Sequence, residues 1–163
     1  MRKLAALAAG LAALLVAFAA PAMASTTTSV KMSFTEPIVQ DVNSGCPTLG
    51  LPEGGFCGNG IVVPYGHATE MIAFGAGCGG ACDLRTVSVA GSSIVIDETF
   101  SSPQCPGSCQ PNPAEPASGS LTDVIVGGTG IFAGATGTLT GAVTAAGLQS
   151  HVQLSGTITL ASR

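Results

Sequence analysis

Charged residues are scarce in this sequence, and basic ones are the scarcest. Five lysines and arginines stand against nine acidic residues, and after position 3 the only basic residues are Lys31, Arg85 and Arg163. Nucleic acids and anionic membranes bind to clustered positive charge, so the composition argues against both as partners. After residue 24 the chain also lacks an apolar run long enough to span a membrane.

Sequence motifs for catalysis or metal binding are missing as well. The chain has no G-x-S-x-G, no H-E-x-x-H, no acidic calcium loop and no C-x-x-C. The glycine turn at Gly127–Gly130 is not followed by the Lys-Ser/Thr pair of a phosphate-binding loop. Hydrolase, metalloenzyme and redox functions therefore have no motif to rest on, and we expect no cofactor and no metal.

The N-terminus has the pattern of a secretory signal peptide. Arg2 and Lys3 precede an apolar run, Leu4–Ala20, and the small-residue site Ala22-Met23-Ala24 follows it. We expect cleavage after residue 24, a secreted protein, and one domain over residues 25–163. Cleavage would remove two basic residues and no acidic one, so the formal charge would change from −4 to −6. The alternative is an uncleaved anchor, for which the run is at the short limit.

Alternation of apolar and polar residues predicts strands along the rest of the chain. The longest instance is Leu148–Leu160, after a turn at residues 145–147, and no helical periodicity appears after the signal peptide. The other predicted segments are a strand that begins at Val30 and could continue past Pro37, a strand region at Ile61–Phe74 that Pro64 and Gly66 interrupt, a hairpin of Leu84–Ala90 and Ile94–Phe100, and strands at 121–126 and 138–143. The sequence thus predicts an all-β fold of six to eight antiparallel strands.

A glycine-rich stretch, Val124–Gly141, bends the predicted sheet. Gly127, Gly128 and Gly130 indicate a turn with unusual backbone dihedrals. Gly134 and Gly137 fall within an expected strand, where glycine marks a bend or the close approach of another backbone. Together with the length of the final strand, this favours the curved wall of a single β-barrel over a flat sandwich.

The same stretch, GGTGIFAGATGTLTG followed by SGTITL, resembles the C-terminal part of the allene oxide cyclase and dirigent superfamily of small β-barrels. A GG[ST]G-x-F-x-x-A-x-G pattern recurs there, and the whole chain after the signal peptide is similar to uncharacterised secreted bacterial proteins of that barrel type. The resemblance implies the barrel. Members of the superfamily include cyclases, stereochemical guides and proteins with no known activity, so it implies no single function. No pocket residue outside the glycine motif matches, and none is carried over.

Six cysteines in a secreted chain predict three disulfides. The local arrangement pairs Cys46 with Cys57, Cys78 with Cys82 and Cys105 with Cys109, and would pin two loops at Asn43–Gly60 and Ser101–Gly119. A nested arrangement would instead pair Cys78 with Cys109 and Cys82 with Cys105. A four-thiolate zinc site at these last four cysteines has suitable spacing, but an oxidising compartment removes free thiolates.

Tyr65, His67 and Glu70 are the densest group of side chains capable of proton transfer. On a strand His67 and Glu70 point to opposite faces, so a pair of these two would need a bulge or a neighbouring strand. Acid–base catalysis also needs contact with the substrate and a suitable pKa. The alternative is that all three are surface or rim residues.

Glu98 shares its parity with Ile94 and Ile96, whereas the adjacent Asp97 points to the other face. If the apolar face lines the barrel, Glu98 beside Arg85 is a pocket candidate. Otherwise Glu98 is an end-of-strand residue that reaches solvent. We name Glu98, Arg85, Tyr65 and Glu70 as the candidate catalytic residues.

The sequence also predicts positions for His151 and Asp123. His151 lies on the polar parity of the last strand and has no convergent partner, so we expect it to be exposed. We expect Asp123 near the barrel mouth beside the Gly127–Gly130 turn.

Three functional hypotheses follow. The first is a secreted, non-catalytic barrel that binds a small apolar molecule or a surface partner. The second, implied by the resemblance, is a cofactor-free cyclase or isomerase whose barrel orients a reactive substrate. The third is a structural or adhesive envelope protein. Inward charged groups around a cavity would favour the enzyme, an apolar cavity the binder, and a filled core the structural role.

Overall fold

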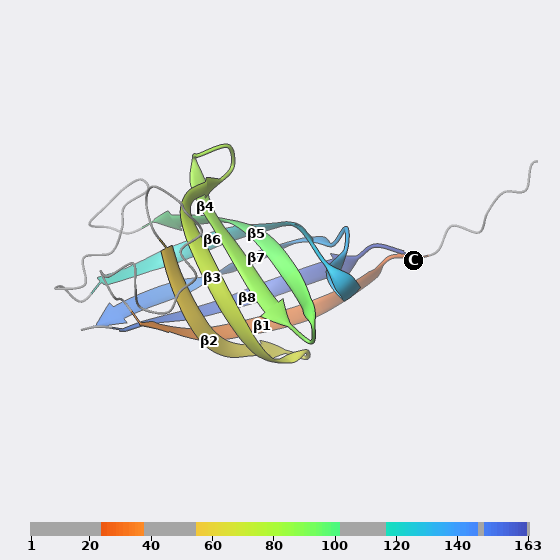
Figure 1. Cartoon of the computed structure of the whole chain (residues 1–163), viewed down its shortest axis with the longest axis horizontal. Helices are drawn as coiled ribbons and strands as arrows, with labels where there is room; N and C mark the ends of the chain where they lie inside the picture. The colour runs from red at the N-terminus through yellow and green to blue at the C-terminus, as the bar shows by residue number, and fades with distance from the viewer. Residues whose placement is uncertain (1–23, 38–54, 102–116, 147–148, 163) are drawn as a thin grey trace, which may run out of the picture.

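The computed structural model describes residues 24–37, 55–101, 117–146 and 149–162. These residues form one closed barrel of eight antiparallel strands, in which each strand pairs with the next along the chain (Figure 1). The strands are β1 (Thr26–Pro37), β2 (Gly55–Val63), β3 (Gly66–Gly77), β4 (Cys82–Val89), β5 (Ser92–Ser101), β6 (Ala117–Gly128), β7 (Thr136–Ala146) and β8 (Gln149–Leu160). The predicted all-β barrel is confirmed.

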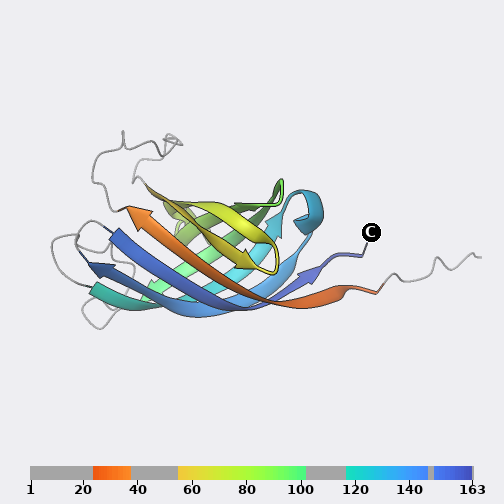
Figure 2. The same ribbon diagram turned by 90° about the horizontal axis from the view of Figure 1, so that it is seen from below.

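The first and last strands close the barrel. β1 pairs with β8 from Thr26 opposite Leu160 to Pro37 opposite Gln149, and Figure 2 shows the two strands running side by side. Because every described strand has a partner on both sides, the described sheet has no free edge.

Strand alternation directs apolar side chains into the barrel. On β1, Val30, Met32 and Phe34 are buried, whereas Lys31 and Ser33 between them are exposed. The predicted parity of the last strand is confirmed for Val152, Leu154 and Ile158, which are buried, and for His151 and Gln153, which are exposed. The apolar core also includes Val62, Ala68, Val87, Val89, Ile94, Ile96, Leu121, Ile125, Phe132, Ala135 and Leu139.

The glycine-rich stretch is a turn where a curved strand was predicted. β6 ends at Gly128, a single 3₁₀ turn, η1 (Gly130–Phe132), follows, and β7 begins at Thr136. Gly130 and Gly134 have positive φ angles of 56° and 69°, and both lie between β6 and β7, so the strand prediction at Gly134 was wrong. Gly137 lies in β7 as predicted, and a Cβ there would collide with the Thr157 carbonyl.

The predicted interruption of the region Ile61–Phe74 is confirmed, and the region forms two strands because Pro64 cannot donate a ladder hydrogen bond and Gly66 has a φ of 105°. Other predicted boundaries were wrong. Residues Gly55–Gly60, predicted as loop, belong to β2, and the start of β6 extends into the second predicted loop. Both strands contain glycine and polar residues that weaken the apolar pattern on which strand prediction depends.

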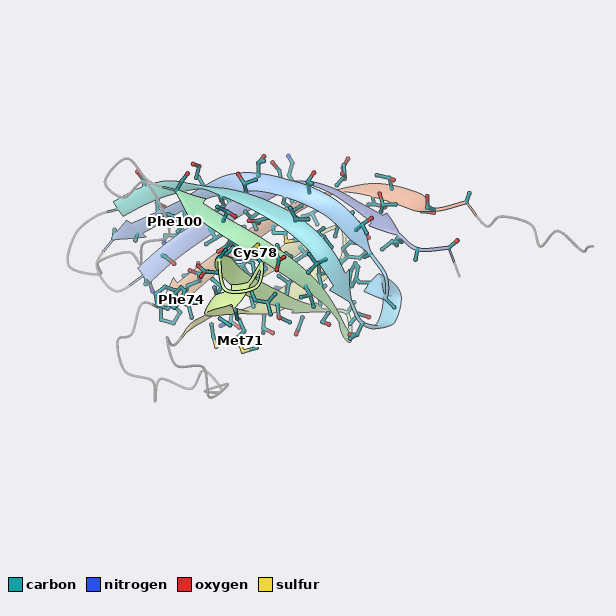
Figure 3. The ribbon with its side chains drawn as sticks, turned by 90° about the horizontal axis from the view of Figure 1, so that it is seen from above. Met71, Phe74, Cys78 and Phe100 are labelled. Atoms are coloured by element: carbon teal, nitrogen blue, oxygen red, sulfur yellow. A yellow bond between two sulfur atoms is a disulfide. The ribbon has the colours of Figure 1, made fainter. Side chains whose placement is uncertain are left out.

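The local disulfide Cys78–Cys82 is confirmed, with the two Cα atoms 5.4 Å apart. It closes the tip of the β3–β4 hairpin, where Figure 3 labels Cys78. The bond excludes the nested pairing and takes the thiolates that the zinc site would need. Cys57, on β2, is also disulfide-bonded. Its predicted partner Cys46, like Cys105 and Cys109, lies outside the described residues.

The predicted signal peptide, apart from Ala24, also lies outside them, so its cleavage stays a prediction. Within the described ranges, no helix has the length and apolarity needed to cross a bilayer.

Candidate functional site

Seven polar or charged side chains are buried among the residues that the structure describes, of which Ser92 lies at the β4–β5 turn and the other six come from six strands. We call these six the interior cluster, and it comprises Glu36 of β1, Glu70 of β3, Arg85 of β4, Glu98 of β5, Asp123 of β6 and Ser150 of β8. Arg85 is 1% exposed and Asp123 is 0% exposed. Each of the six lies on the inward face of its strand, two residues from a buried apolar side chain. Glu36 follows Phe34 in this way, and Glu98 follows Ile96. Strand alternation therefore delivers all six to the interior.

The cluster lies in the half of the barrel where β1 ends and β8 begins, since Glu36 and Ser150 are paired there. At the opposite end, the Tyr65 and Phe132 rings pack edge to face, with centroids 4.9 Å apart. The interior thus has a polar half and an apolar half.

Arg85 holds three of the carboxyl groups. Its Nε donates to Glu98 Oε2 at 2.6 Å, and its Nη1 donates to Glu36 Oε1 at 3.2 Å and to Glu70 Oε2. The Ser150 hydroxyl donates to the other oxygen of Glu36. Burial alone would lower the pKa of Arg85, but the charges of Glu98, Glu70 and Glu36 outweigh it and raise the pKa. The guanidinium therefore remains positive.

Two carboxyl groups of the cluster are poorly satisfied. Neither oxygen of Asp123 has a hydrogen-bond partner, and Oε1 of Glu70 has none. Burial raises the pKa of Glu70 to about 9, an effect that Glu36 reinforces and Arg85 opposes. Burial also raises the pKa of Asp123 to about 8, and the neighbouring charge of Glu98 acts in the same direction while Arg85 opposes it. Both carboxyl groups are therefore mainly protonated at neutral pH.

Charge balance explains these shifts. One guanidinium faces four carboxyl groups, so full ionisation would leave a net charge of −3 in a region shielded from water. Burying uncompensated charge costs several kcal/mol per ion, and proton uptake by two carboxyl groups avoids most of that cost. The barrel interior then still has a net negative charge, and it also contains protonated carboxyl groups that can donate protons.

Gly58, on β2, makes room for two of the glutamates. It is buried opposite Glu70, and a Cβ built there would lie 2.6 Å from Glu70 Oε1 and 3.0 Å from Glu36 Cγ. Any side chain at this inward position would displace the carboxyl groups from Arg85 or from each other. The glycine is thus part of the cluster's geometry.

Three of the four candidate catalytic residues, Glu98, Arg85 and Glu70, meet in the cluster, and the solvent-exposed alternatives for Glu98 and Glu70 are wrong. Tyr65 lies at the opposite end of the barrel, so it does not join them. His67 is exposed on the outer face, as the parity argument required.

His151 is exposed as predicted, and its Nδ1 lies 3.2 Å from the Thr35 hydroxyl oxygen. Asp123 is not beside the Gly127–Gly130 turn. It is paired with Glu98 in the barrel interior, several residues before that turn.

The chain matches no family model, no curated protein and no solved structure. The chemistry of the site therefore has to be argued from its own residues.

Sequence reasoning missed Glu36 and Ser150 and misplaced Asp123. The signal was present, because Glu36 continues the parity of Val30, Met32 and Phe34, and Asp123 stands between Leu121 and Ile125. A charged residue on the apolar parity is usually assumed to end the buried part of a strand. Here the strand continues and the charge is buried.

The cluster has the groups that acid–base chemistry needs. Protonated Asp123 and Glu70 can donate a proton at neutral pH, while Glu98 and Glu36 supply negative charge next to Arg85. Two grooves on the barrel's outer surface, one lined by parts of β2 to β5 with Thr129 and one by parts of β1, β2, β7 and β8, contain none of these six residues.

Proposed function

We propose that this protein is a secreted, cofactor-free isomerase or cyclase of the allene oxide cyclase and dirigent type, with the interior cluster as its acid–base site. The observation that carries the proposal is Asp123, a fully buried carboxyl group whose two oxygens have no partner and whose pKa is raised to about 8. A carboxyl group held protonated at neutral pH is a ready general acid.

The charge of the cluster indicates the type of reaction. Carboxylates outnumber the guanidinium, so the site stabilises developing positive charge better than negative charge. We therefore expect Asp123 to transfer its proton to one carbon of an electron-rich carbon–carbon double bond of the substrate, such as that of an enol ether, which breaks the π bond and leaves the positive charge on the other carbon. The resulting cation rearranges or closes a ring and returns one proton to Asp123. No cofactor is consumed, and the product has the same formula as the substrate.

The other two hypotheses receive less support from the interior. A purely apolar ligand would not use four buried carboxyl groups and a guanidinium. A barrel with only a structural role gains nothing from such a cluster, since well-packed apolar residues in place of a buried ionic network are often neutral or stabilising. The serine- and threonine-rich outer faces of β1, β7 and β8 are compatible with any of the three functions.

The first experiment is to find the substrate. The protein is purified from the culture medium of its native host and denatured, and the released small molecules are identified by mass spectrometry. Each released compound, and the low-mass fraction of the medium, is then incubated with fresh protein in D₂O with a chelator and no added cofactor. We expect a product with the formula of its substrate that has gained one deuterium, because Asp123 exchanges its proton with solvent.

Two variants make the test specific. Asp123→Asn should slow formation of the isomer by about 100-fold or more, the usual contribution of a general acid. Asp97→Asn is the matched control, because Asp97 is next to Glu98 on β5 but points to the outer face. A protein that carries no compound and converts none, or equal rates in wild type and Asp123→Asn, would contradict the proposal and favour a structural barrel.

A further inference from the structure

The unpaired oxygens of Asp123 imply a specific ligand chemistry. An ionised carboxylate only accepts hydrogen bonds, so Asp123 in its ionised form would need donors that the described residues do not supply. Glu98 faces it from β5, and the residue opposite it on β7 is the apolar Leu139. The only positive group of the cluster, Arg85, already donates to three glutamates.

Arg85 also shows what kind of group the cluster accepts. Its N–H groups are bound by carboxylate oxygens from three different strands. A second nitrogen cation beside Asp123 and Glu98 would repeat the same charge-assisted hydrogen bonds and would bring one positive charge to an interior that has one cation and four carboxyl groups.

We propose that the interior cluster is a binding site for the ammonium group of a small organic cation, which Asp123 holds through its two free carboxylate oxygens, and that the site excludes carboxylates and phosphates. The inference rests on the proposed function, because it takes the cluster as the place where small molecules bind. It extends that function by naming the ligand class. A stable ammonium ion resembles the positive charge of the proposed transition state and should bind better than a neutral substrate analogue.

Binding of the cation exchanges a proton. Asp123 is mainly protonated when the site is free, and the ammonium ion binds its ionised form, so one proton leaves as the ligand enters. The groups that face Asp123 are Glu98 and Arg85, of which Glu98 favours and Arg85 opposes its protonation. Affinity should therefore rise with pH up to about 8 and level off above it, until the amine itself loses its proton near pH 10.

The test is isothermal titration calorimetry of the purified protein with butylammonium chloride, using sodium butyrate as a probe of equal chain length and opposite charge. We expect butylammonium to bind about 100-fold more tightly at pH 9 than at pH 6, the change that a single group of pKa near 8 produces. Titrations in two buffers of different ionisation enthalpy should show release of close to one proton at pH 7. Magnesium chloride at equal ionic strength controls for a general effect of charge.

Asp123→Asn should weaken butylammonium binding at least tenfold and abolish the proton release, whereas Asp97→Asn should change neither. Should Asp123→Asn fail to fold, the pH dependence and the proton count of the wild type still decide. Equal binding of butyrate, binding without proton release, or no binding of butylammonium between pH 6 and 9 would overturn the inference. If the protein isomerises a substrate but does not bind butylammonium, the proposed function stands and only this inference fails. If it binds butylammonium but isomerises no substrate, only the proposed function fails.

Discussion

Arg85 is the single positive charge among the carboxyl groups inside the barrel, and its removal has an asymmetric effect. A guanidinium in a buried network contributes little net stability, because its desolvation offsets most of the attraction. Its loss nevertheless leaves Glu36, Glu70 and Glu98 without the donor that each of them uses. Arg85 therefore adds little net stability while it is present, but its removal destabilises the protein because three carboxyl groups lose their hydrogen-bond donor.

We expect Arg85→Ala to lower the free energy of unfolding by about 3–5 kcal/mol at pH 7, the usual penalty for breaking a buried ion pair from one side. The penalty should be smaller at pH 5, where the abandoned glutamates can take up protons more easily. Urea unfolding at the two pH values measures both quantities. A loss below about 1 kcal/mol, or a loss independent of pH, would mean that the glutamates have other partners.

Asp123 and Glu70 make the protein less stable as the pH rises. Their folded-state pKa values, about 8 and about 9, lie above the ordinary values of 3.8 and 4.5. Between about pH 4 and pH 8 the folded state therefore holds protons that the unfolded state has released. Linkage then makes the free energy of unfolding fall with rising pH, by up to about 1.4 kcal/mol per pH unit for each proton.

Asp123→Asn should remove one of these two contributions. We expect the variant to be more stable than the wild type at pH 7, by up to about 4 kcal/mol, and equally stable near pH 2, where Asp123 is protonated in both the folded and the unfolded state. Urea unfolding at several pH values between 2 and 7 gives the slope, with Asp97→Asn as the comparison. A variant that is less stable than the wild type at pH 7 would show that Asp123 is ionised and compensated.

At this scale the sequence indicated half of the cluster. Parity with Ile94 and Ile96 placed Glu98 on the apolar face, and Arg85 and Glu70 were named beside it. Their convergence could not be predicted, because it depends on the register of six strands and on the closure of the barrel. Tyr65 was grouped with Glu70 by nearness along the chain, but Tyr65 lies in the β2–β3 turn, whereas Glu70 lies within β3 and points into the barrel.

At the scale of single elements, the β4–β5 hairpin has an imperfect turn. Its two connecting residues, Ala90 and Gly91, have φ angles of 51° and 70°. Positive values at both positions characterise the type I′ turn, which matches the twist of the strands and favours Asn-Gly. Alanine at the first position adopts the left-handed region at a cost of about 1–2 kcal/mol.

We expect Ala90→Asn to raise the free energy of unfolding by about 0.5–1 kcal/mol, because asparagine tolerates this conformation better than alanine. Thermal or urea unfolding checks the gain. Ala81→Asn, in the disulfide-closed β3–β4 turn and without a positive φ, is the control and should gain nothing. Equal effects of the two substitutions would argue that solubility or the unfolded state, and not the turn, is responsible.

At the scale of the whole molecule, the alternation of apolar and polar residues predicted an all-β fold, and the glycines of Val124–Gly141 predicted that the sheet is curved. The strand number was bracketed correctly, and the local Cys78–Cys82 disulfide was one of the two arrangements considered. Pro64 and Gly66 predicted the break between β2 and β3, but the start of β2 at Gly55 was missed because its first residues are mostly glycine and polar. Barrel closure itself is a long-range property, and the pairing of β1 with β8 leaves no mark in either strand alone.

That pairing places the two ends of the barrel wall beside each other, with Thr26 opposite Leu160. A circular permutant that joins residue 162 to residue 25 through a short glycine-serine linker and opens the chain between Ala90 and Gly91 should fold to the same barrel, about 1–2 kcal/mol less stable than residues 25–162 in the natural order. Far-UV circular dichroism and urea unfolding test it. An unfolded permutant would show that the β4–β5 hairpin must be covalently continuous for the barrel to form.

The closure between β1 and β8 also has a consequence in time. β1 is synthesised early and can pair with β2 soon afterwards. Its other neighbour, β8, is synthesised only after more than a hundred further residues. Until then, both ends of the growing sheet expose unpaired backbone, the state in which β-proteins aggregate most readily. The barrel cannot close until β8 has left the ribosome, so its closure is late relative to the synthesis of its other strands, and the growing sheet must be protected throughout that wait.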